Sequence, residues 1–355
     1  MRVGVFCLLL AYLLSQFYRA FLAVLAPVLQ ADIGASATDL ARASGLWFLA
    51  FAAMQLPVGW ALDRIGPRRV AGGLLGVAGG GGALAFAAAG SPLTIDVAMV
   101  LIGIGCAPVL MASYYIFARV YPAAIFGTLA GAMVGTGTLG NLAASLPLAL
   151  AVEAFGWRGA LVVLGGVTVA VAVALWIFVK DPPPVPDGSP KGSLIDLLRL
   201  PALWLILPIA LVNYAPSAGI RGVWAGPYLA DVFGMDATGI GKVTLLMGIA
   251  MVVGNFAYGP MDRLLGSRKW VIVGGNLTAT ACLIYLWLYP AGGLWTTAAF
   301  LGLIALLGAS YPLIVAHGRS FIPAHLTGRG VTLLNLFAMG GVALHQFISA
   351  RVHAV

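Results

Sequence analysis

The stretch that decides the fold is the charged segment Gly59-Trp60-Ala61-Leu62-Asp63-Arg64-Ile65-Gly66-Pro67-Arg68-Arg69, which interrupts two long apolar runs. A segment of the same character, residues 259–269 (GPMDRLLGSRK), lies 200 positions further on and is again flanked by apolar runs. A charged loop between apolar runs of about 20 residues is typical of helices that cross a membrane. The sequence therefore predicts a duplicated architecture in which each half contains one such charged loop.

The composition agrees with a membrane protein. Of 355 residues, 61% are hydrophobic and only 8% are charged, whereas a soluble domain has about 25% charged residues. This excludes a water-soluble globule and a disordered chain, and three cysteines exclude a disulfide scaffold. The net charge of +8 comes from scattered Lys and Arg residues rather than from a basic domain, so no nucleic-acid partner is predicted.

Apolar stretches long enough to span a membrane recur along the chain, and none shows the alternation of a β-barrel strand. We predict an all-α polytopic membrane protein with eleven spans, centred near residues 17, 52, 80, 107, 139, 169, 216, 251, 281, 306 and 340. The first apolar run resumes beyond Arg19 and reaches Leu29, which is too long for a signal peptide and predicts an uncleaved first span.

The basic residues of the loops predict the orientation. If the amino terminus is cytoplasmic, most loop Lys and Arg residues fall on the cytoplasmic side, as the positive-inside rule requires. The short loops favour a bacterial inner membrane as the location. We also predict a monomer in the lipid bilayer, because the sequence contains no oligomerisation signal beyond glycine ladders that serve equally within one chain.

The two halves of the sequence repeat. A shift of 200 positions matches identical residues at Pro27/Pro227, Leu29/Leu229, Gly34/Gly234, Ala37/Ala237, Thr38/Thr238, Leu46/Leu246, Ala50/Ala250, Gly59/Gly259, Gly66/Gly266 and Arg68/Arg268. Internal repeats of this kind are typical of transporters. We predict two pseudo-repeated helical bundles: residues 1–180 with six spans, a Pro-rich cytoplasmic linker at 181–200, and residues 201–355 with five spans.

The two charged loops resemble the Gly-x-x-x-Asp-Arg-x-Gly-Arg-Arg signature of the major facilitator superfamily, with the Asp-Arg pair displaced by one residue in the second copy. The similarity extends to residues 27–34, residues 155–158 and the central linker. It implies a secondary transporter that works by alternating access. It also implies a gating role for loop residues Gly59, Asp63, Arg64, Gly66, Arg68, Asp262, Arg263 and Arg268, which would hold the two halves together on the cytoplasmic side.

The number of predicted spans departs from this family. The superfamily has twelve spans, and the twelfth is apparently missing from this sequence. The alternative is therefore a truncated, non-transporting accessory protein of the membrane.

Two arginines lie inside predicted spans, where an arginine costs about 2.5–3.5 kcal/mol even on lenient insertion scales. Because Arg19 and Arg221 occupy the first span of each half, we expect them to face one cavity and to hold an anion by forked hydrogen bonds. The alternative is that one or both arginines snorkel or bond to backbone carbonyls of a neighbouring span. Helical spacing and depth add polar residues to this predicted substrate-binding set: Gln16, Asn141, Tyr214, Ser217, Trp224 and Tyr311.

The spacing from Arg19 to Pro27 resembles that of organophosphate:phosphate antiporters, in which two central arginines bind phosphate. Arg221 does not align with the second of those arginines. No Asp or Glu lies in the middle of a predicted span, which disfavours cation transport and a proton-carrying carboxylate.

We therefore predict transport of a small organic or phosphorylated anion, in exchange for another anion. A proton-coupled exporter of drugs or metabolites is the alternative within the same family. No nucleophile, nucleotide or metal motif is recognisable, so we predict neither an enzyme nor a cofactor or metal.

Overall fold

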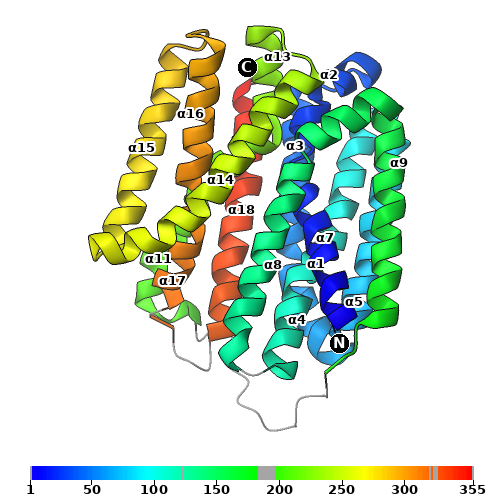
Figure 1. Cartoon of the computed structure of the whole chain (residues 1–355), viewed down its shortest axis with the longest axis vertical. Helices are drawn as coiled ribbons and strands as arrows, with labels where there is room; N and C mark the ends of the chain where they lie inside the picture. Colours follow the sequence, from blue (N-terminus) through cyan, green and yellow to red (C-terminus); the bar gives the residue numbers. More distant parts are fainter. Residues whose placement is uncertain (1, 122, 183–196, 320, 323–326, 354–355) are drawn as a thin grey trace.

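A computed structural model describes residues 2–121, 123–182, 197–319, 321–322 and 327–353. Within these ranges every regular element is a helix, which confirms the predicted all-α fold (Figure 1). We refer to residues 2–182 as the first half and to residues 197–353 as the second half. Most of the predicted linker, residues 183–196, lies outside the described residues.

The first half contains α1 (Arg2–Phe17), α2 (Leu22–Ile33), α3 (Ala37–Ala53), α4 (Gln55–Arg64), α5 (Pro67–Leu74), η1 (Leu75–Gly80), α6 (Gly81–Ala87), α7 (Pro92–Val120), α8 (Ala123–Ala143) and α9 (Leu146–Phe178). The second half contains α11 (Pro201–Asn213), α12 (Ala215–Gly219), η2 (Ile220–Trp224), α13 (Ala225–Phe233), α14 (Ala237–Leu265), α15 (Arg268–Leu288), α16 (Leu294–Leu307), η3 (Gly308–Ser310), α17 (Tyr311–Arg319) and α18 (Thr327–His353).

Many of these helices are long and apolar enough to cross a membrane. Within the described residues, eight meet that condition by length and composition, or nine if α1 and α2, bent by 52°, form one span. The predicted spans near residues 139 and 306 correspond to α8 and to the shorter apolar segment Leu294–Ser310. The exact arrangement of six and five spans remains a prediction.

The internal repeat is visible in the turns before α3 and α14. Gly34 and Gly234 end the preceding helices with φ angles of 66° and 64°, a left-handed conformation that glycine adopts without steric cost. Two residues later, the side chains of Ser36 and Asp236 accept hydrogen bonds from backbone N–H groups in the first turn of the next helix. The same turn therefore precedes α3 in the first half and α14 in the second half.

The turn between α1 and α2 is held in place by buried aromatic packing. The Phe21 ring lies 5.3 Å from that of Phe86, which in turn packs edge-on against Trp157. The Tyr18 hydroxyl shares a 2.8 Å hydrogen bond with the Thr168 hydroxyl on α9. These contacts fix residues 18–21, and with them Arg19, against the rest of the first half.

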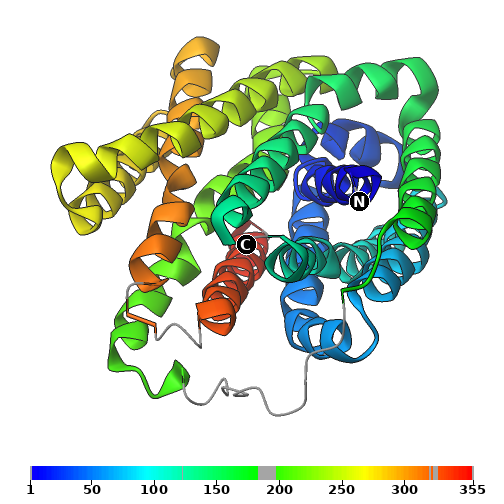
Figure 2. The same ribbon diagram turned by 60° about the horizontal axis from the view of Figure 1, so that its bottom comes forward.

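The two halves contact each other mainly toward one end of the bundle. We call this the far end, because it lies opposite the amino terminus, at the top of Figure 1. There α2 packs on α13, α9 on α14, and α3 on α18. Figure 2 brings the opposite end forward and shows the helices of the two halves lying largely to either side.

The closest approach at this seam involves Gly226 on α13. A Cβ atom at Gly226 would lie only 2.1 Å from the backbone oxygen of Ala23 on α2. Only glycine allows the two helix backbones to approach this closely. The far end is therefore tightly closed in this conformation.

Candidate functional site

Arg19 and Arg221 both lie where a helix is interrupted. Arg19 occupies the turn that joins α1 to α2, and Arg221 lies in the π-helical turn η2. Interruptions within a membrane helix are tolerated where they are buried in protein or line a cavity. The interruptions therefore mark the part of each half in which a polar site can exist.

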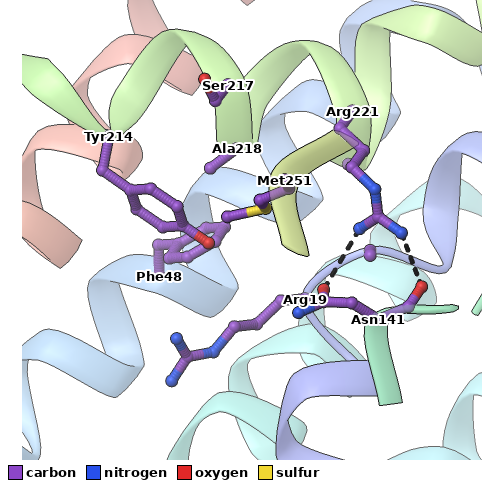
Figure 3. Close-up of a pocket in the computed structure, with 10 residues that line it drawn as sticks. Arg19, Phe48, Asn141, Tyr214, Ser217, Ala218, Arg221 and Met251 are labelled. Carbon is purple, nitrogen blue, oxygen red and sulfur yellow. Dashed lines mark hydrogen bonds between the residues drawn. The ribbon is translucent and has the colours of Figure 1, made fainter. Parts of the chain in front are cut away.

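Both arginines line one pocket between the two halves (Figure 3). The pocket contains about 260 Å³ of space, open solvent included. Of the sequence-predicted substrate residues, it brings together Arg19, Asn141, Tyr214, Ser217 and Arg221. The other three, which are not among the residues lining it, are Gln16, Trp224 and Tyr311.

Arg221 is buried, with 4% of its surface exposed, and its guanidinium reaches across to the first half. Nη1 donates to Oδ1 of Asn141 at 3.1 Å, and Nη2 donates to the Asn141 backbone oxygen at 2.6 Å. Nη2 also donates to the hydroxyl of Ser145 at 3.0 Å. Among the described residues, the acceptors of Arg221 are therefore neutral, and none of them is a carboxylate.

The Asn141 backbone oxygen is available because the helix breaks between α8 and α9. The Ser145 N–H bonds to the oxygen of Leu142, three residues back, instead of to that of Asn141. Pro147, at the start of α9, has no N–H to continue the α8 pattern. The break therefore creates an acceptor inside the protein, and this oxygen accepts from both Arg221 and the Ser145 hydroxyl.

Arg19 has different surroundings. Its guanidinium carbon lies 4.8 Å from the centre of the Phe51 ring and 5.5 Å from that of Trp47. Among the described residues it forms no ion pair, and its Nε is buried without a hydrogen-bond partner. Figure 3 shows the two guanidinium groups pointing away from each other. Arg19 is thus the arginine whose donors remain available.

Phenol groups from both halves surround Arg19. Tyr12 on α1 and Tyr311 on α17 lie within electrostatic range of Arg19. The Tyr12 hydroxyl accepts a hydrogen bond from Gln16, and the Tyr311 hydroxyl donates to Oδ1 of Asn335. The Tyr214 ring lies 6.3 Å from the Tyr311 ring. The site therefore combines one cation with several hydroxyl groups.

Two of the predicted substrate residues direct their polar atoms elsewhere. The Ser217 hydroxyl donates to the backbone oxygen of Ile304 at 3.0 Å and points away from Arg19 in Figure 3. The Trp224 indole N–H donates to the hydroxyl of Ser349 at 3.0 Å. Both bonds join helices of the second half, so these side chains support its packing in this conformation.

Sequence reasoning missed three residues of the site. Ser145 follows Asn141 by one helical turn and precedes Leu146-Pro147, and that pattern could have indicated a helix break with a polar lining. Trp47 and Phe51 are one turn apart on α3, but no sequence pattern distinguishes them from ordinary core aromatics. Their contact with Arg19 depends on how α3 packs against the turn after α1.

The predicted gating residues lie at the end opposite the far end, and only part of the set can be described. Gly66 is the N-cap residue of α5, and the Asp181 carboxylate accepts a 2.7 Å hydrogen bond from the Arg68 backbone N–H. The Arg68 side chain lies 3.8 Å from the same carboxylate, so its described partner belongs to its own half. Gly59 has open space at its Cβ position, and Arg64 is exposed. The side chains outside the described set are those of Asp63, Asp262, Arg263 and Arg268.

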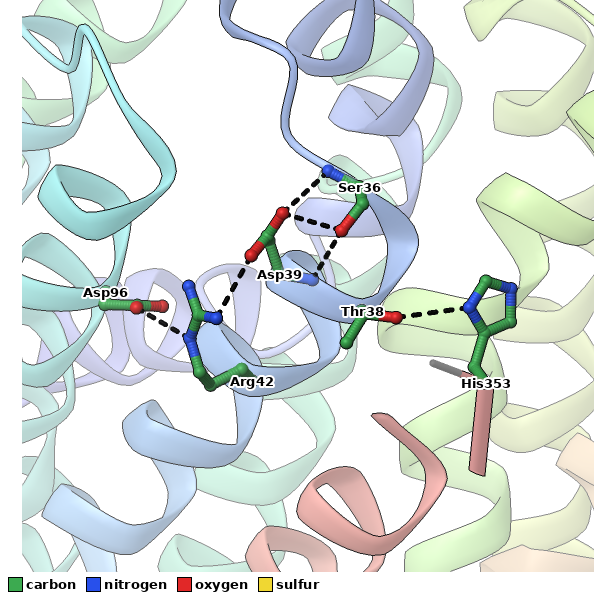
Figure 4. A network of polar contacts seen from close by, with 6 residues as sticks. All are labelled: Ser36, Thr38, Asp39, Arg42, Asp96 and His353. Atoms are coloured by element: carbon green, nitrogen blue, oxygen red, sulfur yellow. Dashed lines mark hydrogen bonds and ion pairs between the residues drawn. The ribbon is translucent and has the colours of Figure 1, made fainter. Parts of the chain in front are cut away.

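A polar network lies at the far end (Figure 4). Arg42 bridges Asp39 on its own helix and Asp96 on α7, at 3.1 and 2.8 Å. One helical turn away, the Thr38 hydroxyl lies 3.2 Å from Nδ1 of His353 on α18. Thr38 and His353 therefore join the two halves, whereas Arg42 fastens two helices of the first half.

The fold and this site define an integral, multi-pass membrane protein with a charged pocket between two helical halves. The family model of the Major Facilitator Superfamily matches residues 8–344. The chain therefore belongs to the Major Facilitator Superfamily, as its loop motifs predicted.

Two curated relatives are similar in sequence. A protein of Cupriavidus necator, named for sulfoacetate transport, is 25% identical over 298 residues, which cover 78% of this chain and 66% of the relative. A protein of Agrobacterium vitis, named for tartrate transport, is 29% identical over 138 residues, which cover 37% of this chain and 29% of the relative. The chain thus spans just under two thirds of the first relative and less than a third of the second.

Solved structures share the fold. A bacterial homologue of the human lysosomal transporter Spinster, described as inward-facing and unoccupied, superposes with a TM-score of 0.83 at 20% identity, covering 99% of this chain and 82% of that one. A D-xylose-proton symporter superposes with a TM-score of 0.73 at 14% identity, covering 98% and 89%. At these identities the likeness supports the fold alone.

Proposed function

We propose that this protein is a secondary transporter that moves a small organic anion across the membrane by alternating access. The observation that carries the proposal is Arg19. It is a cation at a helix break, it lines a pocket between the two halves, and it has no carboxylate partner among the described residues. Such a charge is costly within a membrane unless it serves a ligand or a relay.

The surroundings of Arg19 favour an anion over a cation. None of the described residues lining the pocket is acidic, so no carboxylate among them would neutralise a bound cation or carry a proton. The guanidinium and the nearby phenol hydroxyls are instead suited to the oxygens of a carboxylate or sulfonate. The relatives named for sulfoacetate and tartrate transport point to the same class of substrate.

The absence of acidic residues from the described lining of the pocket refines this proposal. Without a proton-carrying carboxylate at the pocket, exchange of one anion for another fits better than proton symport. A proton-coupled exporter has no support from any lining residue.

We further propose that the protein is a monomer of a bacterial inner membrane with its amino terminus in the cytoplasm. The far end then faces the periplasm, and the conformation described here is closed on that side. Labelling of single cysteines placed at Thr38 and at Arg64 in intact cells and in inverted vesicles tests this orientation. Labelling of the Arg64 position from outside intact cells contradicts it.

Uptake into proteoliposomes tests the proposed function. Labelled sulfoacetate and tartrate are offered to the purified protein, with choline as a cationic control. We expect uptake of at least one anion and none of choline. The matched control for Arg19→Ala is Arg351→Ala, because Arg351 is exposed on α18 and remote from the pocket. If neither anion is transported or bound, or if Arg19→Ala behaves like Arg351→Ala, the proposal is wrong.

A further inference from the structure

The bonds of Arg221 form the most fully built polar contact between the two halves. Arg221 belongs to η2 of the second half, and its acceptors Asn141 and Ser145 flank the α8–α9 break of the first half. The contact is sealed by α14, where a Cβ atom at Gly248 would lie 2.9 Å from Leu142 and 3.0 Å from Nη2 of Arg221. The guanidinium is thus enclosed on the far-end side of the pocket.

This contact exists only while the halves are close together. Opening of the far end must separate η2 from the α8–α9 break, because the two elements belong to different halves. Separation leaves the Asn141 backbone oxygen with only the Ser145 hydroxyl as a donor, and leaves Arg221 without its three acceptors. Each lost bond to a charged donor weighs against opening, so the contact stabilises the closed far end.

The acceptors are weak competitors for the guanidinium. An amide oxygen, a backbone oxygen and a hydroxyl are neutral, whereas a carboxylate or sulfonate forms charge-assisted bonds that are roughly twice as strong. Arg221 lines the same pocket as Arg19, and its Nε is buried without a partner. An anion with two acidic groups can therefore place one group at Arg19 and offer the other to Arg221.

We propose that Asn141 and Ser145 are positioning residues that latch Arg221, and that a two-headed anion bound at Arg19 releases this latch. The empty protein is then held closed at the far end, whereas the loaded protein can open. The return of the empty protein becomes the slow step, so transport proceeds mainly as exchange. The inference rests on the proposed function, because it describes how substrate bound at the same site controls opening of the far end.

The first test compares two modes of transport in proteoliposomes with sulfoacetate as the probe. Net uptake is measured with empty vesicles, and exchange with vesicles that contain sulfoacetate. We expect the parent to exchange at least about tenfold faster than it accumulates. Ser145→Ala should raise the ratio of net uptake to exchange about threefold, and Asn141→Ala, which removes the Oδ1 acceptor, by a similar or larger factor.

Asn255→Ala provides the matched control. Asn255 lies on α14 and bonds to the backbone oxygen of Met251 within its own helix, so it does not join the halves. Its ratio of net uptake to exchange should equal that of the parent. The latch is refuted if Ser145→Ala and Asn141→Ala leave that ratio unchanged while sulfoacetate is still transported. Absence of transport by the parent contradicts the proposed function instead.

A second measurement does not depend on transport. A cysteine at Thr38, in the seam of the far end, reports opening through its rate of maleimide labelling, and the three described native cysteines are buried. Sulfoacetate should accelerate labelling of the parent severalfold, and methanesulfonate, which has one acidic group, should not. The Ser145→Ala variant should label at the faster rate without any anion. Equal labelling of the empty variant and the empty parent overturns the proposal.

Discussion

The two arginines occupy comparable places in the two halves, yet their surroundings differ. Arg221 is buried and donates to three neutral acceptors across the seam. Arg19 is partly exposed and rests against two aromatic rings of its own half, and among the described residues its buried Nε has no hydrogen-bond partner. The difference indicates a division of labour, in which one arginine binds and the other holds the halves together.

This comparison also shows that two arginines with the same charge can have different hydrogen-bond partners. Both side chains carry the same group at an interrupted membrane helix. What distinguishes them is the α8–α9 break, which supplies a backbone acceptor to Arg221 and has no described counterpart beside Arg19. The chemistry available to each arginine is therefore set by the element facing it rather than by its own helix.

The largest expected effect follows from removing the positive charge of Arg19. Arg19→Leu should lower anion uptake at least about 100-fold, because it removes the charge and the forked donors together. Its melting temperature should stay within a few degrees of the parent, since the Arg19 guanidinium has no ion pair to lose within the described residues. Initial uptake rates and thermal unfolding in detergent check this. A normal uptake rate would end the proposed division of labour.

Arg221→Leu should lower the stability of the protein more than Arg19→Leu does. It leaves Oδ1 of Asn141 buried without its donor, and leaves the Asn141 backbone oxygen with only the Ser145 hydroxyl as a donor. Each unsatisfied buried group costs about 1–3 kcal/mol. We expect a melting temperature several degrees below that of Arg19→Leu, measured under identical conditions. If the two leucine variants melt at the same temperature, the Arg221 contact adds no stability beyond that contributed by Arg19.

A smaller effect is expected from the rings beneath Arg19. Phe51→Leu retains an apolar side chain of similar bulk but removes the π-face, which contributes about 0.5–2 kcal/mol. We predict an increase in KM for sulfoacetate of about 3- to 10-fold with little change in the maximal rate. Phe86→Leu, in the aromatic cluster away from the guanidinium, is the control. A similar rise in KM for both variants would mean that the rings serve only packing.

The smallest effect is expected at the exposed end of the seam. Thr38→Ala removes one hydroxyl contact with His353, and such exposed bonds contribute little. We predict less than a twofold change in uptake and less than about 1 kcal/mol in stability. A larger loss in either measurement would show that the seam, and not the Arg221 contact, dominates closure of the far end.

Much of the fold could be predicted from the sequence, because its causes are local. Apolar runs define the helices, and Gly34 and Gly234 mark the repeated turn by position alone. The loop motif at residues 59–69 indicates the family through its residue types and their spacing. These features follow from composition, spacing and backbone conformation, all of which can be read from a single chain.

The site was predictable in its residues but not in its contacts. Arg19, Asn141, Tyr214 and Arg221 were expected near one cavity, because polar groups inside spans are costly and must face protein or water. The hydrogen bonds of Arg221 were not foreseeable, because they depend on the helix break at Ala144–Ser145 and on the approach of the other half. Side-chain direction across such a seam is a tertiary property.

The closeness of Gly226 to Ala23 has a practical consequence. The methyl group added by Gly226→Ala would clash with the Ala23 backbone oxygen, so it cannot be accommodated while the two helix backbones remain in contact. The substitution should therefore shift the population toward the state open at the far end, whatever ligand is present. One added carbon atom thus offers a way to trap, and then to image, the conformation that the closed protein conceals.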